Sequence, residues 1–373
     1  MRATMHAGAG ALLLLVASLS MAGGGAVRAR ADADGAPVAE EEDLTPVGEE
    51  AVVFDAATCG SDAPLVITNV TEAADLTGVR WVKGDLNFGS QSYYDSFMVD
   101  DVWHSVSEDV PAEARDLRCV EGALRIWNST SIDLQHLENL VAVGGDLWIY
   151  NSDDLTSLAG LDNIASVGGG LTIWSNDGLT SLAGLNGIAA VEGVLAIYYN
   201  DGLTSLAGLD GIAAVGGNLW IRGNEGLTSL AGLDSITDVE GDLAIYYNGG
   251  LTSLAGLDSI TAVGGDLWIE DNDGLTSLAG LDGITAVGGT LRISGNDGLT
   301  SLAGLNNIAT VGRDLTVKHN NGLTTLAGLD SLTAIGGVTY IGYNDYLTSL
   351  AGIDSITAVA GEPRLKGNEI HVG

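Results

Sequence analysis

The stretch GDLWIEDNDGLTSLAGLDGITAVG, residues 265–288, recurs along the chain with small changes at a fixed 24-residue period. A leucine opens the LTSLAG segment of successive copies at residues 155, 179, 203, 227, 251, 275, 299, 323 and 347. An asparagine stands at residues 176, 200, 224, 248, 272, 296, 320, 344 and 368. Self-similarity at a fixed period of this length indicates a solenoid, in which each repeat is one coil stacked on the last.

Within one copy, Leu267 and Ile269 alternate with Trp268, which is the pattern of a short strand with one face turned inward. From residue 275 to residue 287 an apolar residue follows at every third position, which predicts tight turns, short extended pieces or a single 3₁₀ turn. One coil alone buries too little to offset its chain entropy, so neighbouring coils must supply strand pairing and cover. The asparagine at the same place in every coil predicts an interior hydrogen-bonded ladder.

The start of the chain differs from the repeats. Residues 1–31 combine a charged start, an apolar core at residues 9–22 and a small-residue cleavage site, as in a secretory signal peptide. A retained membrane anchor is the alternative, but the apolar run is short for a membrane span. We therefore expect a secreted or cell-surface protein, extracellular or periplasmic, with no transmembrane segment in the mature chain.

The composition of successive stretches predicts one folded domain behind an acidic spacer. The predicted parts are a signal peptide (1–31), an acidic disordered linker (32–50) and a single β-solenoid domain (51–373). Within the domain we expect atypical N-terminal coils (51–146, with an insert at 89–117), regular 24-residue repeats (147–361) and a C-terminal cap (362–373). Cys59 and Cys119 both lie in the atypical part, and in an exported chain we expect them to form a disulfide. A metal site is the alternative, but it needs more ligands nearby.

The pattern N-x-x-L-T-S-L-A-G-L-x-x-I-x-x-V-G-G-x-L-x-I, carried by residues 265–272 and their copies, resembles the receptor L-domain family. The resemblance covers about residues 59–373. It implies an all-β solenoid, a right-handed parallel β-helix of the receptor L-domain or leucine-rich-repeat-like type, with about 13 coils of the 24-residue repeat. Ordinary leucine-rich repeats share the L-x-L-x-x-N core, whereas the Gly-Gly pairs and the spacing by three favour the L-domain coil. The resemblance does not imply a particular ligand.

The residues that flank the inward isoleucine of each strand point outward, and many are aromatic. Stacked aromatic residues can simply cover a sheet, because they are good strand formers. Alternatively, an exposed row of aromatic residues marks a surface that binds protein or sugar. The candidate ligand-binding strip consists of Trp148, Tyr150, Trp174, Tyr198, Trp220, Tyr246 and Trp268. We expect Trp220, Tyr246 and Trp268 to form a continuous outward platform.

The formal charge is −35, with 49 acidic and 14 basic residues, so nucleic acid is not an expected partner. An aspartate or asparagine follows LTSLAGL in every regular copy, where it can cap its own turn. Calcium between coils is the alternative, and otherwise no cofactor is expected. The basic residues Arg292, Arg313, Lys318 and His319 form one non-repeating cluster, which we interpret as local charge balance.

Catalysis has little support, because the histidines are isolated from any nucleophile pattern and near-perfect repetition leaves few singular places. The sequence therefore predicts an exported, non-enzymatic, monomeric repeat protein. It is expected to present an aromatic, acidic β-sheet face that binds protein or carbohydrate. The alternatives are a structural surface rod without a specific ligand, and a carbohydrate-active β-helix enzyme.

Overall fold

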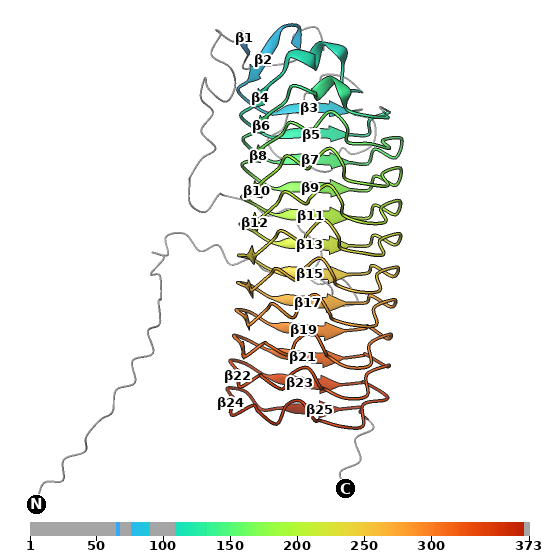
Figure 1. Ribbon diagram of the computed structural model, residues 1–373, viewed down its shortest axis with the longest axis vertical. Helices are drawn as coiled ribbons and strands as arrows, with labels where there is room; N and C mark the ends of the chain where they lie inside the picture. Colours follow the sequence, from blue (N-terminus) through green and yellow to red (C-terminus); the bar gives the residue numbers. More distant parts are fainter. Residues whose placement is uncertain (1–64, 68–75, 90–108, 131, 369–373) are drawn as a thin grey trace, which may run out of the picture. The chain divides into compact units, whose positions relative to one another are not determined.

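The computed structural model describes residues 65–67, 76–89, 109–130 and 132–368, all of which belong to one unit, Glu49–Gly373. The predicted signal peptide, the linker, Cys59 and most of the predicted insert lie outside the described residues. Within this unit the chain forms an all-β parallel solenoid, as predicted (Figure 1).

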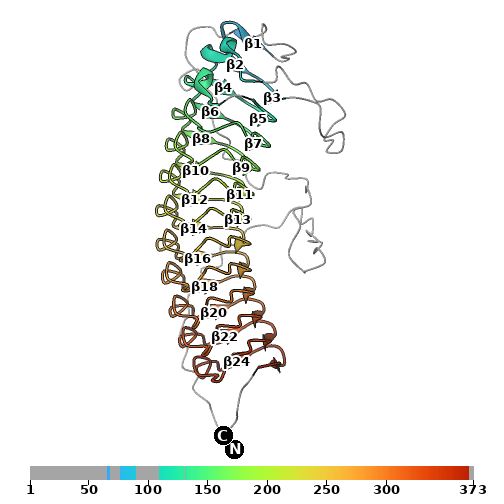
Figure 2. The ribbon, with the colours of Figure 1, turned by 90° about the vertical axis from the view of Figure 1, so that its right-hand side faces the viewer.

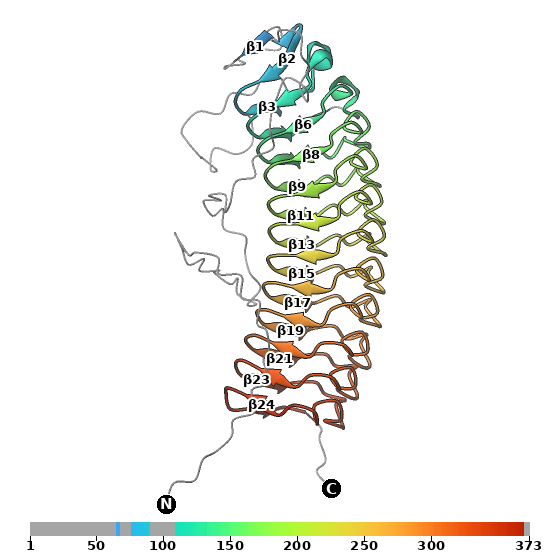
Figure 3. The ribbon, with the colours of Figure 1, turned by 60° about the vertical axis from the view of Figure 1, so that its left-hand side comes forward.

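Each regular coil contributes one strand to each of two parallel sheets, as the coil around residue 267 illustrates. Ala262–Val263 forms a two-residue strand, a Gly-Gly turn follows, and Leu267–Glu270 forms a four-residue strand. Turns over the LTSLAGLDGIT segment then return the chain to the first sheet, one coil further on. Figure 2 shows the two columns of strands running down the solenoid, and Figure 3 shows the turns that complete the coils.

The larger strands form a 12-stranded sheet in sequence order. Its strands are β3 (Leu86–Gly89), β5 (Leu124–Trp127), β7 (Leu147–Tyr150), β9 (Leu171–Trp174), β11 (Leu195–Tyr198), β13 (Leu219–Arg222), β15 (Leu243–Tyr246), β17 (Leu267–Glu270), β19 (Leu291–Ser294), β21 (Leu315–Lys318), β23 (Thr339–Gly342) and β25 (Arg364–Lys366).

The shorter strands form a 13-stranded sheet, also in sequence order. Its strands are β1 (Leu65–Ile67), β2 (Val79–Val82), β4 (Cys119–Val120), β6 (Ala142–Val143), β8 (Ser166–Val167), β10 (Ala190–Val191), β12 (Ala214–Val215), β14 (Asp238–Val239), β16 (Ala262–Val263), β18 (Ala286–Val287), β20 (Thr310–Val311), β22 (Ala334–Ile335) and β24 (Ala358–Val359). Two 3₁₀ turns, η2 (Ala112–Asp116) and η3 (Gln135–Leu137), lie in the irregular coils near the N-terminal end.

Neighbouring coils pair in register, so that Leu267 lies beside Leu243 and Leu291. The prediction of about 13 coils of the 24-residue repeat was too high for the regular coils, because the 24-residue spacing does not extend to the first coils. Leu86 pairs with Leu124 across an insertion, and Leu124 pairs with Leu147 at a spacing slightly below the regular period. The regular spacing therefore begins only at β7. About ten coils of the 24-residue type follow, and the first coils carry the insertions.

The core is one continuous column of leucine, isoleucine and valine. In the coil around β17, Leu267, Ile269, Leu275 and Leu278 are all fully buried. The same positions are filled in each regular coil, so identical side chains stack above and below one another. Each coil therefore covers the apolar edge of its neighbour.

The predicted asparagine ladder is confirmed. Asn272 is fully buried, and its amide nitrogen donates hydrogen bonds to the carbonyl oxygens of Ile245 and Glu270, both at 2.9 Å, and to Oδ1 of Asn296 at 3.3 Å. Its own Oδ1 accepts hydrogen bonds from the backbone N–H and the side-chain amide of Asn248, at 3.1 and 3.2 Å. The ladder thus satisfies buried polar groups of three coils at once.

Two glycines of the repeat are required for different reasons. Gly280 has φ +110°, and a Cβ placed there would lie 2.1 Å from the carbonyl oxygen of Leu254 in the previous coil. Gly265 does not have a positive φ, but a Cβ there would lie 2.1 Å from Oδ1 of Asp242 and 2.8 Å from a backbone carbon of Gly241. The Gly-Gly pairs therefore permit close approach between coils, rather than an unusual backbone angle.

Candidate functional site

The outward face of the 12-stranded sheet carries the predicted strip. In β17, Leu267 and Ile269 point into the core, whereas Trp268 is half-buried on the outer side. Because the coils pair in register, the residue before each inward isoleucine forms one column and the residue after it forms a second. Trp220 and Trp268 thus lie in one column, on either side of Ala244.

A third column comes from the residues that directly follow these strands, which often have a positive φ although they are not glycine. Tyr199, Tyr247 and Tyr343 have φ values of 51°, 57° and 55°. This left-handed residue turns the chain so that the following asparagine can enter the core. Its side chain leans toward the next coil: a Cβ added at Gly223 would lie 2.5 Å from the ring of Tyr199.

At the N-terminal end of the strip, four aromatic residues form what we term the N-terminal aromatic stack: Trp127, Trp148, Tyr150 and Trp174. The ring of Tyr150 stacks between those of Trp127 and Trp174, with centroids 5.9 and 6.2 Å away and interplanar angles of 11° and 14°. Trp148 meets Tyr150 edge-on, at 6.3 Å and 76°. Offset stacks and edge-to-face pairs of this kind are the favourable arrangements of aromatic rings. The candidate ligand-binding strip did not include Trp127, which is 6% exposed.

Further along the sheet an arginine takes the place of a ring. The guanidinium carbon of Arg222 lies 5.3, 5.1 and 5.5 Å from the ring centroids of Tyr199, Tyr246 and Tyr247. These distances are within the range of cation–π attraction. We term these four residues the arginine–tyrosine cluster. Only Tyr246 among them belongs to the predicted strip. Tyr199 and Tyr247 were left out because they directly follow their strands, where their φ is positive.

Tyr198 and Trp220 connect the two groups of rings. Their centroids are 6.4 Å apart, with an interplanar angle of 23°. Burial raises the pKa of the Tyr198 hydroxyl, and that hydroxyl has no hydrogen-bond partner among the described residues.

The expected platform of Trp220, Tyr246 and Trp268 is not continuous. Tyr246 is only 5% exposed, because Arg222 and its tyrosines cover it. Ala244 lies between the two tryptophans and is fully buried, so their bulky rings close over it. Part of the strip therefore covers the sheet, as the first interpretation of the aromatic residues predicts.

The outward face is basic, not acidic as the sequence analysis expected. Among the strands of the 12-stranded sheet, Glu270 is the one acidic residue that the structure describes. The same strands carry six basic residues: Arg125, Arg222, Arg292, Lys318, Arg364 and Lys366. Acidic residues are disfavoured in strands and favoured in turns, so the repeat places them at the corners of the coils.

One charged cluster interrupts the repeating pattern. Glu270 forms an ion pair with Arg292, although Glu270 is only 5% exposed. Burial raises the pKa of Glu270 to about 7, and Arg292 opposes this shift. Burial, followed by the like charge of Arg292, lowers the pKa of Lys318. Burial also raises the pKa of Asp271, against a hydrogen bond from Tyr247. Of the predicted basic cluster, the structure thus brings Arg292 and Lys318 together.

Five of the aspartates after LTSLAGL cap their turns, as predicted. Asp210 Oδ2 accepts a hydrogen bond from the N–H of Gly208 at 2.8 Å, and four further aspartates do the same. A second row was not predicted: Asp242 Oδ1 accepts the N–H of Asp266 at 2.7 Å, one coil further on. Burial raises the pKa of Asp242. In the part of the chain that the structure describes, no three His, Cys, Asp or Glu side chains are placed to hold a metal ion.

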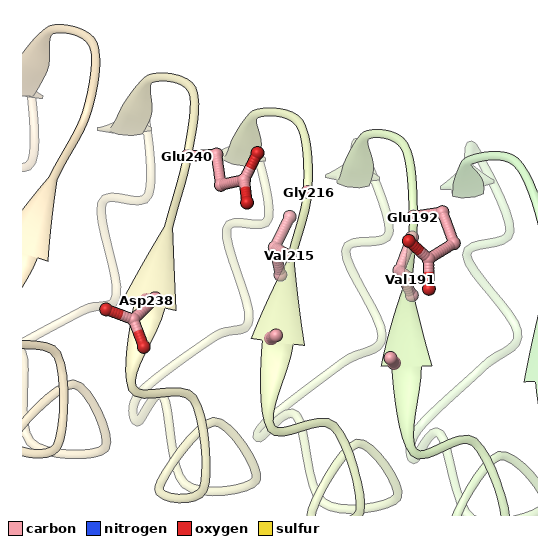
Figure 4. A pocket seen from close by; sticks show the side chains of 8 residues that line it. Val191, Glu192, Val215, Gly216, Asp238 and Glu240 are labelled. Atoms are coloured by element: carbon pink, nitrogen blue, oxygen red, sulfur yellow. The ribbon is translucent and has the colours of Figure 1, made fainter. Parts of the chain in front are cut away.

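The other sheet has a shallow hollow, shown in Figure 4. Gly216 has no side chain there, and Glu192 and Glu240 of the two neighbouring coils flank the gap, with Asp238 beside them. Cys119 is buried on β4 of the same sheet. Since Cys59 lies outside the described residues, the Cys59–Cys119 bond stays a prediction.

In comparisons with known proteins, the chain matches no family and no curated protein. None of the described residues forms a helix long and apolar enough to cross a membrane.

Proposed function

We propose that this is an exported, non-enzymatic protein that binds a protein or carbohydrate ligand through the outward face of its 12-stranded sheet. The observation that carries the proposal is the clustering of aromatic side chains on this one face. Four rings of the N-terminal aromatic stack contact one another across β5, β7 and β9. Half-buried aromatic groups in one contiguous patch are typical of recognition surfaces.

The N-terminal aromatic stack is the part of the strip best placed to meet a ligand. Trp148, Tyr150 and Trp174 keep part of their surface exposed, whereas Tyr246 is covered. Their ring contacts hold the side chains in place before a ligand arrives, which reduces the entropy lost on binding. We infer that a ligand runs along this stack across several coils.

Export and a surface location rest on the features of residues 1–31, and monomeric state on the stacking of coils within one chain. The coil pattern supports membership of the receptor L-domain type of solenoid, with ordinary leucine-rich repeats as the alternative. We propose no cofactor and no nucleic-acid partner.

A structural rod without a specific ligand is the second candidate. The full burial of Ala244 and the low exposure of Tyr246 favour it, because they show aromatic side chains covering the sheet. The two candidate functions predict different effects on ligand binding and on stability when the N-terminal aromatic stack is removed.

The experiment is a binding screen of the mature protein against arrays of glycans and surface proteins, followed by a triple variant, Trp148→Ser, Tyr150→Ser and Trp174→Ser. A recognition role predicts loss of binding with unchanged circular dichroism and monomer size. Tyr346→Ser is the matched control, because Tyr346 is 64% exposed and lies outside the strip. The structural rod would be supported if the triple variant has a lower melting temperature and either the screen finds no ligand or the variant still binds it.

A further inference from the structure

Beyond the N-terminal coils, most basic residues of the solenoid lie toward the C-terminal end of the 12-stranded sheet. Six basic residues follow Trp127, and five of these lie in strands of this sheet; Arg313 is the other. Four of the five lie in β19, β21 and β25. In a chain of formal charge −35, this grouping concentrates positive charge on a surface whose neighbouring corners are acidic.

Two lysines of this region occupy equivalent positions two coils apart. Lys318 pairs in register with Gly342, and Gly342 pairs with Lys366. At about 4.8 Å per coil, the backbones of the two lysines are roughly 10 Å apart. Gly342 contributes no side chain between them.

An aromatic ring fills the space above Gly342. A Cβ added at Gly342 would lie 2.8 Å from the hydroxyl oxygen of Tyr340 and 2.9 Å from its Cζ. The Tyr340 side chain therefore lies along the strand, over the glycine and in the gap between the two lysines. It is half-buried, so part of the side chain remains open to solvent.

A second aromatic pair borders this gap. His319 stacks on Tyr343, with ring centroids 5.0 Å apart and an interplanar angle of 4°. The ammonium of Lys366 lies 5.4 Å from the centroid of Tyr343. These contacts hold Lys366 beside the aromatic rings.

We propose that Lys318, Tyr340 and Lys366 form a binding site for an acidic polysaccharide, a chain of pyranose rings that carry carboxylate groups. The tyrosine offers an apolar surface to the C–H groups of a sugar ring, and the lysines on either side meet carboxylates of adjacent rings. The two lysines and the ring between them follow one column across three coils, so an extended polymer would lie along the solenoid axis.

The site favours a sparsely charged sugar polymer over other polyanions. An acidic peptide would pair with the lysines but has no ring to place on Tyr340. Nucleic acid carries a much denser row of charges, and acidic residues at the corners of the coils, such as Asp314 directly before β21, would repel it. The inference rests on the proposed function, because the site lies on the same outward face, but none of its residues belongs to the N-terminal aromatic stack, so the two can fail separately.

The test measures binding of the mature protein to polygalacturonate by isothermal titration calorimetry. A neutral galactan, polyglutamate and single-stranded DNA serve as the comparison polymers. We expect binding of polygalacturonate alone. Lys318→Gln with Lys366→Gln should weaken it at least about tenfold, since both charge-assisted contacts are removed. Tyr340→Val should also weaken it, although this variant keeps both charges and a strand-forming side chain.

Lys83→Gln with Arg115→Gln is the matched control, because it makes the same change in net charge at two exposed residues of the N-terminal coils. This control and the triple variant of the N-terminal aromatic stack should bind polygalacturonate as the wild type does. The inference is overturned if the wild type does not bind, if polyglutamate or DNA binds as tightly, or if both double variants weaken binding equally. Retained binding by the Lys318–Lys366 double variant or by Tyr340→Val, with unchanged circular dichroism, would also overturn it.

Discussion

Replacement of Asn272 by alanine tests the interior ladder. Asn272 is fully buried, and its side chain takes part in five hydrogen bonds that join three coils. Alanine would remove this donor from the carbonyl oxygen of Ile245 and this acceptor from the backbone N–H of Asn248, whereas the carbonyl oxygen of Glu270 keeps its hydrogen bond from the backbone N–H of Tyr247, at 3.1 Å. The fold itself needs no other change, because the backbone N–H of Asn272 still donates to Asn296.

The expected loss follows from the groups that become unpaired. Each buried polar group left without a partner costs about 1–3 kcal/mol, and two backbone groups, the carbonyl of Ile245 and the N–H of Asn248, lose the Asn272 side chain. We therefore expect Asn272→Ala to lower the free energy of unfolding by about 2–5 kcal/mol. Asp282→Ala is the matched control: the side chain is exposed, and surface substitutions usually change stability by less than about 0.5 kcal/mol.

Urea titration followed by circular dichroism provides the comparison, with both variants and the wild type at the same protein concentration. We expect a clearly lower midpoint for Asn272→Ala alone. If the two variants unfold at the same urea concentration, the ladder does not contribute as the structure indicates.

Three further predictions follow from single features of the chain. Gly280→Ala should destabilise the protein by more than about 2 kcal/mol in the same titration, because the φ of Gly280 is +110° and the new Cβ would meet the carbonyl oxygen of Leu254. Gly78→Ala is the control, because no atom lies within 4 Å of the added Cβ, and it should cost only about 1 kcal/mol. Equal losses in the two variants would contradict the clash. Burial raises the pKa of Glu270 from 4.5 to about 7. Between these pH values the folded protein keeps a proton on Glu270 that the unfolded chain has lost. The free energy of unfolding should therefore fall by on the order of 3 kcal/mol as the pH rises from about 4.5 to about 7. Thermal melts across this range should show that fall in the wild type and a flatter profile in Glu270→Gln, whereas identical profiles would refute it. Mass spectrometry of the exported protein without reduction should find Cys59 bonded to Cys119, and two free thiols would exclude that bond.

The regular coils could be predicted because every copy repeats the same physical requirements. The alternation of Leu267 and Ile269 with Trp268 identified the strand, and the repeated Asn272 position identified the ladder. The first coils could not be counted in this way, because Leu86 and Leu124 are separated by an insertion and no repeat length applies there. The number of coils with the regular 24-residue spacing was overestimated for that reason.

The candidate face was predictable only in part. A period of two gives the columns of outward residues, which is why Trp148 and Tyr150 were found. It does not show that a positive-φ residue such as Tyr199 leans over the next coil, or that Arg222 lies among three tyrosines. The negative charge of the whole chain also gave a wrong prediction for the sheet face, because the acidic residues lie at the corners of the coils while the strands carry basic ones. The Tyr-Tyr-Asn triplets at 198–200 and 246–248 are the sequence signal that could have indicated this cluster.

The central claim is that the outward face of the 12-stranded sheet is the surface that binds. Hydroxyl-radical footprinting of the protein, alone and with the ligand recovered from the binding screen, tests it most directly. We expect the ligand to protect Trp148 and Trp174 from oxidation, while Trp81 on the 13-stranded sheet is oxidised equally in both samples. Protection of Trp81 with unchanged oxidation of Trp148 and Trp174 would contradict the account.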